Sequence, residues 1–258
     1  MAESELSIKY ADLLAEVAAF LGYGSAPTAW TADQRTECDR YVQGGLRRFY
    51  SPPAVQGSEP GYSWSFLSPV VTLATVSGQE TQELPGDLAR VLGQFHYSAT
   101  DHHKSVVQAP EDVFQSYKTS SSSTGAPAAA SVRHKAKDPG RGQRLEVAWW
   151  PIPDAAYTLT YKYEAYNGKL SDDNPYPLGG MRHSELLLES CLAVAEQRAN
   201  DERGNHTAEF ERLLVSAIEQ DRRVGSTHFG HMGDRSEAST WLPRRGDTDG
   251  VTYNGVAL

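Results

Sequence analysis

The sequence is poor in cysteine. It has two cysteines in 258 residues, Cys38 and Cys191, and no CxxC pair. A zinc site built from paired thiolates is therefore not expected. Each cysteine falls on the apolar face of a predicted helix, where a free thiol behaves as a small hydrophobic group. We interpret both as core thiols of a chain made in a reducing compartment.

The sequence also lacks the long apolar runs that membrane proteins need. No stretch approaches the roughly 18–20 apolar residues of a membrane-spanning helix. The first ten residues, MAESELSIKY, lack the basic start and apolar run of a signal peptide. We therefore expect a protein that is made in the cytosol and has no membrane partner.

A surplus of basic residues is absent as well. The chain has 24 Lys and Arg against 33 Asp and Glu, which gives a formal net charge of −9. This balance excludes a general electrostatic attraction to nucleic acid. Arg47-Arg48 and Arg244-Arg245 remain as local basic spots. The first pair lies at a predicted helix end, where it complements the helix dipole.

Motifs of catalysis are missing too. There is no G-x-S-x-G, no Walker loop and no dinucleotide fingerprint. The best metal candidate is Asp101-His102-His103, but neighbouring residues of a strand point to opposite faces, so one ion cannot easily use both histidines. Asp172-Asp173 is a loop pair without further ligands. We expect no enzyme, no metal and no cofactor.

Helical periodicity is present at both ends of the chain. Apolar spacing predicts a helix from Tyr10 to Leu21 and a second helix after the capping box Thr31-Ala-Asp-Gln34. Gly44-Gly45 inside the second helix is either a weak point or a site of close helix approach. Two more helices are predicted over 183–203 and 207–224, and their short connection predicts antiparallel pairing. His183, near a helix start, is interpreted as a capping or surface group.

Between these helices the pattern has the period of strands. Five segments predict strands: 70–76, 88–100, 105–108, 145–150 and 157–166. A short helix is predicted over 110–117, and the Ser/Ala-rich residues 119–131 predict a flexible loop. Trp149-Trp150 would suit a sugar platform, but alternation along a strand directs one of the two toward the core.

The predicted fold class is α+β, with a four-helix bundle made by two N-terminal and two C-terminal helices. We expect four parts: residues 1–60 as the first helical pair, 61–168 as an inserted antiparallel β-domain, 169–224 as the second pair and 225–258 as an extended tail. The tail has too few apolar residues to form its own core. It keeps isolated anchors for docking on a partner: Phe229, Trp241, Leu242, Arg244, Arg245 and Tyr253.

The stretch GYSWSFLSP, residues 61–69, stands where the helical pattern changes to the strand pattern. Tyr62, Trp64, Phe66 and Leu67 are either a ligand platform or a packed junction between the bundle and the β-domain. Alternating side chains would place Trp64 and Phe66 on one face. We predict the junction, with this face packed against the bundle or the base of the sheet.

Several of these segments together resemble the head-to-tail adaptor (connector, head-completion) proteins of tailed bacteriophages. The segments are Leu13-Leu14, Leu21-Gly22, Trp30, residues 44–50 (GGLRRFY), 62–67 (YSWSFL), 84–87 (LPGD), 150–154 (WPIPD), Tyr157, Tyr161, Tyr163, 183–185 (HSE) and 191–196 (CLAVAE). The likeness covers roughly residues 8–222.

The resemblance implies a structural virion protein at the neck, assembled in the host cytoplasm. It implies a ring, usually of twelve copies, bound under the portal protein through the C-terminal segment. The next neck or tail protein would attach to this ring, and genomic double-stranded DNA would pass through it. Two rival hypotheses remain open at this stage: a carbohydrate- or receptor-binding β module of a phage tail, and a metal-dependent hydrolase around Asp101, His102 and His103.

Overall fold

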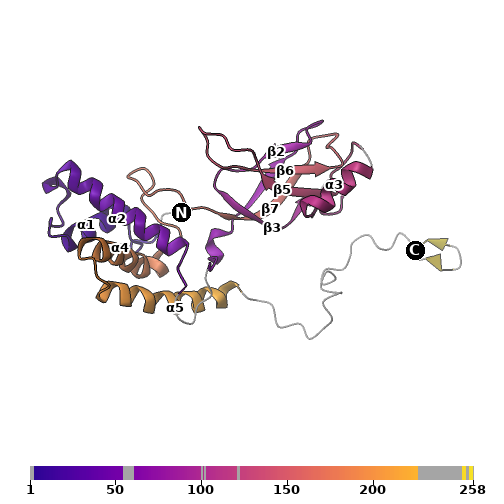
Figure 1. The fold of residues 1–258 in the computed structure, drawn as a ribbon. Coiled ribbons are helices and arrows are strands. Elements are labelled where there is room, and N and C mark those ends of the chain that lie inside the picture. Colours follow the sequence, from indigo (N-terminus) through magenta and orange to yellow (C-terminus); the bar gives the residue numbers. More distant parts are fainter. Residues whose placement is uncertain are drawn as a thin grey trace. The chain divides into compact units, whose positions relative to one another are not determined.

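A computed structural model of the chain describes residues 3–54, 61–99, 101, 103–120, 123–225, 252–253 and 256–257. The chain divides into two compact units, Met1–Arg222 and Arg223–Leu258. The first unit combines helices with two β-sheets (Figure 1). The predicted α+β class is therefore confirmed.

Four helices contribute to one hydrophobic core. They are α1 (Tyr10–Phe20), α2 (Ala32–Tyr50), α4 (Ser184–Ala199) and α5 (Asn205–Gly225). Each supplies fully or almost fully buried side chains to this core, for example Leu13, Val42, Leu187 and Leu214. Helices from both ends of the sequence are thus joined by apolar burial, as single-sided amphipathic helices require.

Local sequence sets the start of α2 and its distance from α4. The predicted capping box is present: the Thr31 hydroxyl accepts from the Gln34 backbone N–H at 3.2 Å, and the Gln34 side chain accepts from the Thr31 N–H at 2.8 Å. Of the two interpretations of the glycine pair, close helix approach is the one observed. A Cβ on Gly45 would lie 2.6 Å from the Cα of Cys191 in α4.

The strands form two sheets. The first is antiparallel in the order β1-β7-β3, and the second has the order β2-β6-β5-β4. The strands are β1 (Val70–Ala74), β2 (Thr81–Glu83), β3 (Leu88–Tyr97), β4 (Val107–Gln108), β5 (Ala129–His134), β6 (Leu145–Trp150) and β7 (Thr158–Ala165). Leu159, Tyr161 and Tyr163 alternate along β7 and are all buried. Phe95 lies against Trp149 of the other sheet, with 5.2 Å between ring centroids.

Two expectations about the strands are wrong. The sheets are not purely antiparallel, because β4 pairs with β5 in parallel and the helix α3 (Glu111–Ser120) connects them. The expected loop 119–131 contains the start of β5, where Ala129, Ala130 and Ser131 are buried. The small side chains at the start of β5 fit into the buried part of the sheet. A segment rich in Ser and Ala is also typical of flexible loops, and for this reason the strand was not predicted. The short strand β2 was not predicted.

Within the second unit, β8 (Thr252–Tyr253) pairs antiparallel with β9 (Val256–Ala257). Sequence reasoning expected an extended tail there. The dipeptide between the two strands, Asn254-Gly255, is a strong sequence signal for a hairpin. Across the described residues, none of the helices is both long and apolar enough to cross a membrane.

Candidate functional site: two crossings between helices and strands

The chain leaves the helices through residues 62–67, which we call the entry crossing. Trp64 is fully buried, and its Nε1 donates to the carbonyl of Phe49 in α2 at 2.8 Å. The ring centroids of Phe49 and Phe66 lie 5.3 and 5.5 Å from that of Trp64. Leu67 is buried in the same core. The entry crossing is therefore packed into the helical core rather than open to a ligand.

Asp221 of α5 holds the backbone of the entry crossing. Its Oδ2 accepts from the Tyr62 hydroxyl at 2.7 Å and from the Ser65 N–H at 2.9 Å, and its Oδ1 accepts from the Ser65 hydroxyl at 2.6 Å. Asp221 is buried, so these donors replace water. Burial, followed by the hydrogen bond to Asp221, raises the pKa of Tyr62, which keeps the phenol protonated as a donor.

The entry crossing is also tied to the strands. The Ser63 hydroxyl donates to Oε1 of Glu164 in β7 at 2.6 Å, and Arg90 of β3 pairs with Oε2 of the same carboxylate at 2.6 Å. Tyr163 then donates its backbone N–H to the Pro69 carbonyl at 3.2 Å. These residues are thus bonded to α2 and α5 on one side and to β7 on the other, and Arg90 of β3 holds the Glu164 carboxylate in place.

His183 ends a short 3-10 helix, Met181–His183, directly before α4. It was predicted to cap the helix or to lie at the surface, and this prediction is wrong. Its side chain makes no capping bond and is 6% exposed. Its ring centroid lies 5.2 Å from those of both Trp64 and Phe66, so the aromatic cluster takes the imidazole into the core. Burial lowers the pKa of His183.

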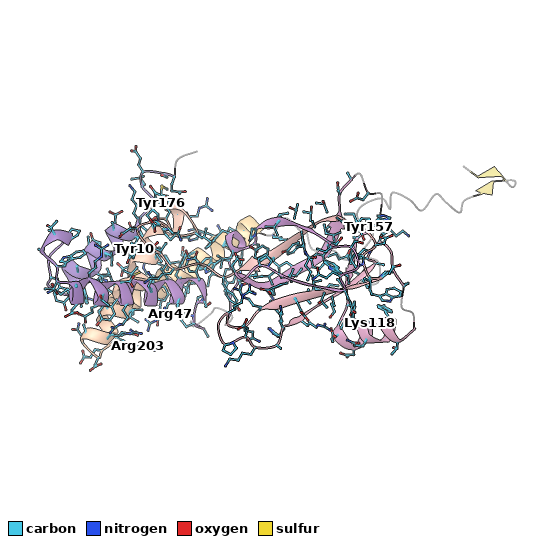
Figure 2. The ribbon with its side chains drawn as sticks, turned by 90° about the horizontal axis from the view of Figure 1, so that it is seen from above. Tyr10, Arg47, Lys118, Tyr157, Tyr176 and Arg203 are labelled. Atoms are coloured by element: carbon cyan, nitrogen blue, oxygen red, sulfur yellow. The ribbon has the colours of Figure 1, made fainter. Side chains whose placement is uncertain are left out.

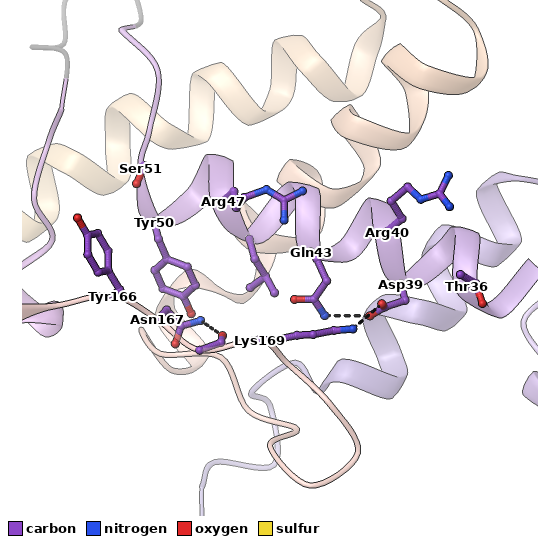
Figure 3. Close-up of a pocket in the computed structure, with 12 residues that line it drawn as sticks. Thr36, Asp39, Arg40, Gln43, Arg47, Tyr50, Ser51, Tyr166, Asn167 and Lys169 are labelled. Atoms are coloured by element: carbon purple, nitrogen blue, oxygen red, sulfur yellow. Dashed lines mark hydrogen bonds and ion pairs between the residues drawn. The ribbon is translucent and has the colours of Figure 1, made fainter. Parts of the chain in front are cut away.

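The chain returns to the helices through residues 166–170, the return crossing, which passes over α2 (Figure 3). Lys169 pairs with Oδ2 of Asp39 at 2.8 Å, and Gln43 donates to both Oδ1 of Asp39 and the Leu170 carbonyl at 2.9 Å. Burial alone would raise the pKa of the Asp39 carboxyl. The hydrogen bonds that Asp39 accepts, first among them that from Lys169, outweigh burial and lower this pKa. The return crossing borders a cavity of about 540 Å³.

The sequence named Tyr62, Trp64, Phe66 and Leu67, and the structure brings these residues together. The expected alternation was wrong in one respect, because Ser65–Leu67 form a 3-10 helix rather than a strand. Sequence reasoning missed the partners Asp221 and Glu164. Both are polar residues in segments with a clear apolar period, so no local signal marked them.

The predicted tail anchors Phe229, Trp241, Leu242, Arg244 and Arg245 lie outside the described residues. Tyr253 belongs to β8, of which only the backbone is described.

The residues behind the rival hypotheses have structural partners. Trp149 is buried in the sheet core, and the ring of Trp150 stacks on Tyr117 of α3 at 5.2 Å. His103 lies against Tyr97 and Tyr157, at 5.0 and 5.5 Å between ring centroids. His102 lies outside the described residues. Among those that are described, no three His, Cys, Asp or Glu side chains are grouped to hold a metal ion.

Comparison with known protein families gives a match over most of the chain. Residues 8–230 match the family model of the SU10 adaptor protein. The chain therefore belongs to the SU10 adaptor protein family, a family of phage head-to-tail adaptors. The adaptor family is a structural one. The comparison with curated proteins gives no match.

Proposed function

We propose that the protein is the head-to-tail adaptor of a phage virion, located at the neck and forming a ring between the portal and the tail. The family match over residues 8–230 is the observation that carries this proposal. In this function the chain catalyses no reaction. It offers the next neck or tail protein a platform and is assembled in the host cytoplasm.

In the ring, α1, α2, α4 and α5 act as one four-helix bundle, and residues 61–168 act as an inserted β-domain. The shared core of the four helices supports this assignment. The two crossings support it as well, because each fixes a connection between helices and strands through several hydrogen bonds.

Residues 225–258 dock on the portal protein, and bundles from twelve copies surround a channel for genomic DNA. The net charge of −9 supports DNA passage rather than DNA capture, because every fixed phosphate contact adds salt-sensitive affinity. We expect the residues that line the channel to be net acidic or polar. A channel lined mainly by Lys and Arg would contradict this expectation.

The experiment that tests the proposed function is electron microscopy of the purified protein mixed with purified portal rings. We expect an added ring of density on the tail-facing side of the portal. A mutant portal that lacks its tail-facing surface serves as the control. A protein that remains solitary in the presence of portal and tail components would contradict the proposal.

A further inference from the structure

Four arginines surround one cavity of the helical core. Arg47 and Arg48 come from the last turns of α2, Arg198 from the end of α4, and Arg203 from the α4–α5 connection. The cavity has a volume of about 410 Å³. Figure 2 shows Arg47 and Arg203 at the same edge of the helices. Two segments far apart in the sequence thus bring their guanidinium groups to a single concave site.

These guanidinium groups have no directly paired carboxylate among the described residues. None of the four arginines forms an ion pair there, whereas Arg35, Arg133 and Lys169 each pair with a carboxylate. Arg48 donates to the neutral side chain of Gln197. Arg198 lies over the ring of Tyr41, 6.0 Å from its centroid. Glu211 also lines the cavity but pairs with none of the four.

The half-buried position of Arg48 makes this lack of counter-charge unusual. Burial, and then the charges of Arg203 and Arg198, lower the pKa of Arg48. The group nevertheless stays protonated at neutral pH, because an arginine pKa lies far above 7. An unpaired guanidinium in such a place is stabilised when an anion enters the cavity and accepts its N–H groups.

The basic surface continues beyond this cavity. Arg47 also lines the neighbouring cavity at the return crossing, together with Arg40 and Lys169. In that cavity the Asp39 carboxylate already forms an ion pair with Lys169 and a hydrogen bond with Gln43. Figure 3 shows Arg40 and Arg47 pointing away from that pair. Two adjoining cavities therefore share one arginine, an arrangement that can accept two successive anionic groups.

We propose that the cavity around Arg47, Arg48, Arg198 and Arg203 binds carboxylate side chains of an acidic polypeptide segment. The planar guanidinium matches a carboxylate with paired hydrogen bonds. Val194 and Phe210 in the lining add apolar contact for the methylene groups of an entering Glu side chain. The net charge of −9 repels a densely charged polyanion such as DNA at long range. A short acidic segment carries fewer charges and needs contact only with the cavity itself. Binding at this cavity needs only the helical core and does not depend on ring formation.

The test measures binding of a fluorescent oligoglutamate peptide to the full chain at low salt. The variant Arg198→Gln/Arg203→Gln changes two exposed side chains, and we expect its affinity for the peptide to fall by about tenfold or more. Arg47→Gln is a second, independent variant with an expected loss in the same direction. Arg212→Gln is the matched control, because Arg212 is an exposed arginine of α5 that pairs with Glu209 outside the cavity. Melting temperatures verify that each variant folds.

The opposing outcomes are distinct. Equal peptide affinity of the intact chain and both cavity variants would overturn the proposal, as would the absence of peptide binding by the intact chain. A DNA duplex of equal net charge provides the competing ligand. Tighter binding of this duplex than of the peptide, lost in the cavity variants, would identify a nucleic-acid site instead. Weak peptide binding that Arg212→Gln reduces equally would show that the attraction is non-specific.

Discussion

At the scale of single residues, Trp64 is expected to contribute strongly to stability. It is completely buried, stacks on Phe66 and donates to the Phe49 carbonyl. Removing it leaves a large void and an acceptor without its donor, two costs that add.

Trp64→Ala is predicted to lower the free energy of unfolding by about 3–5 kcal/mol. Urea unfolding followed by far-UV circular dichroism measures this loss. Trp150→Ala is the control, because the half-buried Trp150 stacks on a surface helix, and its loss should be clearly smaller. Equal losses in the two variants would contradict the packing of the entry crossing.

His183 makes stability depend on pH. Because burial lowers its pKa in the folded state, the unfolded chain takes up a proton first as the pH falls below about 6.5. The stability present above that pH is therefore lost as the pH falls toward the folded pKa. Asp221 opposes this shift and Arg182 adds to it.

Replacing the imidazole by a side chain that does not titrate should remove this part of the pH dependence. His183→Gln is predicted to flatten the decline in unfolding free energy between about pH 7.5 and 5.5, whatever its stability at neutral pH. Urea titrations of both proteins at several pH values give the comparison. Parallel declines in the two proteins would exclude His183 as the source.

At the scale of elements, α2 and α4 are in close backbone contact at Gly45. The Ser190 hydroxyl donates to the Gly45 carbonyl at 2.8 Å, and a Cβ on Gly45 would meet the backbone of Cys191. Backbone atoms cannot move aside as side chains do, so the distance between the two helices depends on the missing methyl group.

Gly45→Ala is predicted to destabilise the protein by about 1–3 kcal/mol, despite the better helix propensity of alanine. The adjacent Gly44→Ala is the matched variant. Its methyl group would meet the Val194 side chain at 3.0 Å, which can adjust. Thermal melts should therefore rank Gly45→Ala as the less stable of the two, and the opposite order would refute the close approach.

The sequence predicted most elements, because a strong period of apolar residues is a local signal. Leu13, Val17 and Val42 marked helices, and Leu159, Tyr161 and Tyr163 marked a strand. The strand β5 was not predicted because Ala129, Ala130 and Ser131 show no such period of apolar residues. The parallel pairing of β4 with β5 depends on the α3 crossover, which is a non-local property. At the entry crossing the aromatic residues were predicted, whereas Asp221 and Glu164 were not, because their importance comes only from tertiary contacts.

At the scale of the whole molecule, the first compact unit ends at Arg222, shortly before the predicted tail begins. A chain that lacks residues 225–258 should therefore keep its fold. In the proposed function this tail docks on the portal.

Deletion of residues 225–258 is predicted to abolish binding to the portal while the melting temperature of the remaining chain changes little. Co-sedimentation with purified portal rings measures the binding, and circular dichroism checks the fold. Trp241→Ala in the full chain is the milder variant and should weaken attachment. Normal attachment of the truncated protein would refute the docking role of the tail.

The contact between α2 and α4 also bears on how the protein is synthesised. The core that covers Val42 and Phe49 includes Leu187, Cys191 and Phe210, which follow every strand of both sheets in the sequence. While the ribosome translates these strands, α1 can already pack on α2, but the part of α2 that packs against α4 lacks that partner and is exposed to aggregation. We therefore expect the full helical core to form only after α4 has emerged from the exit tunnel.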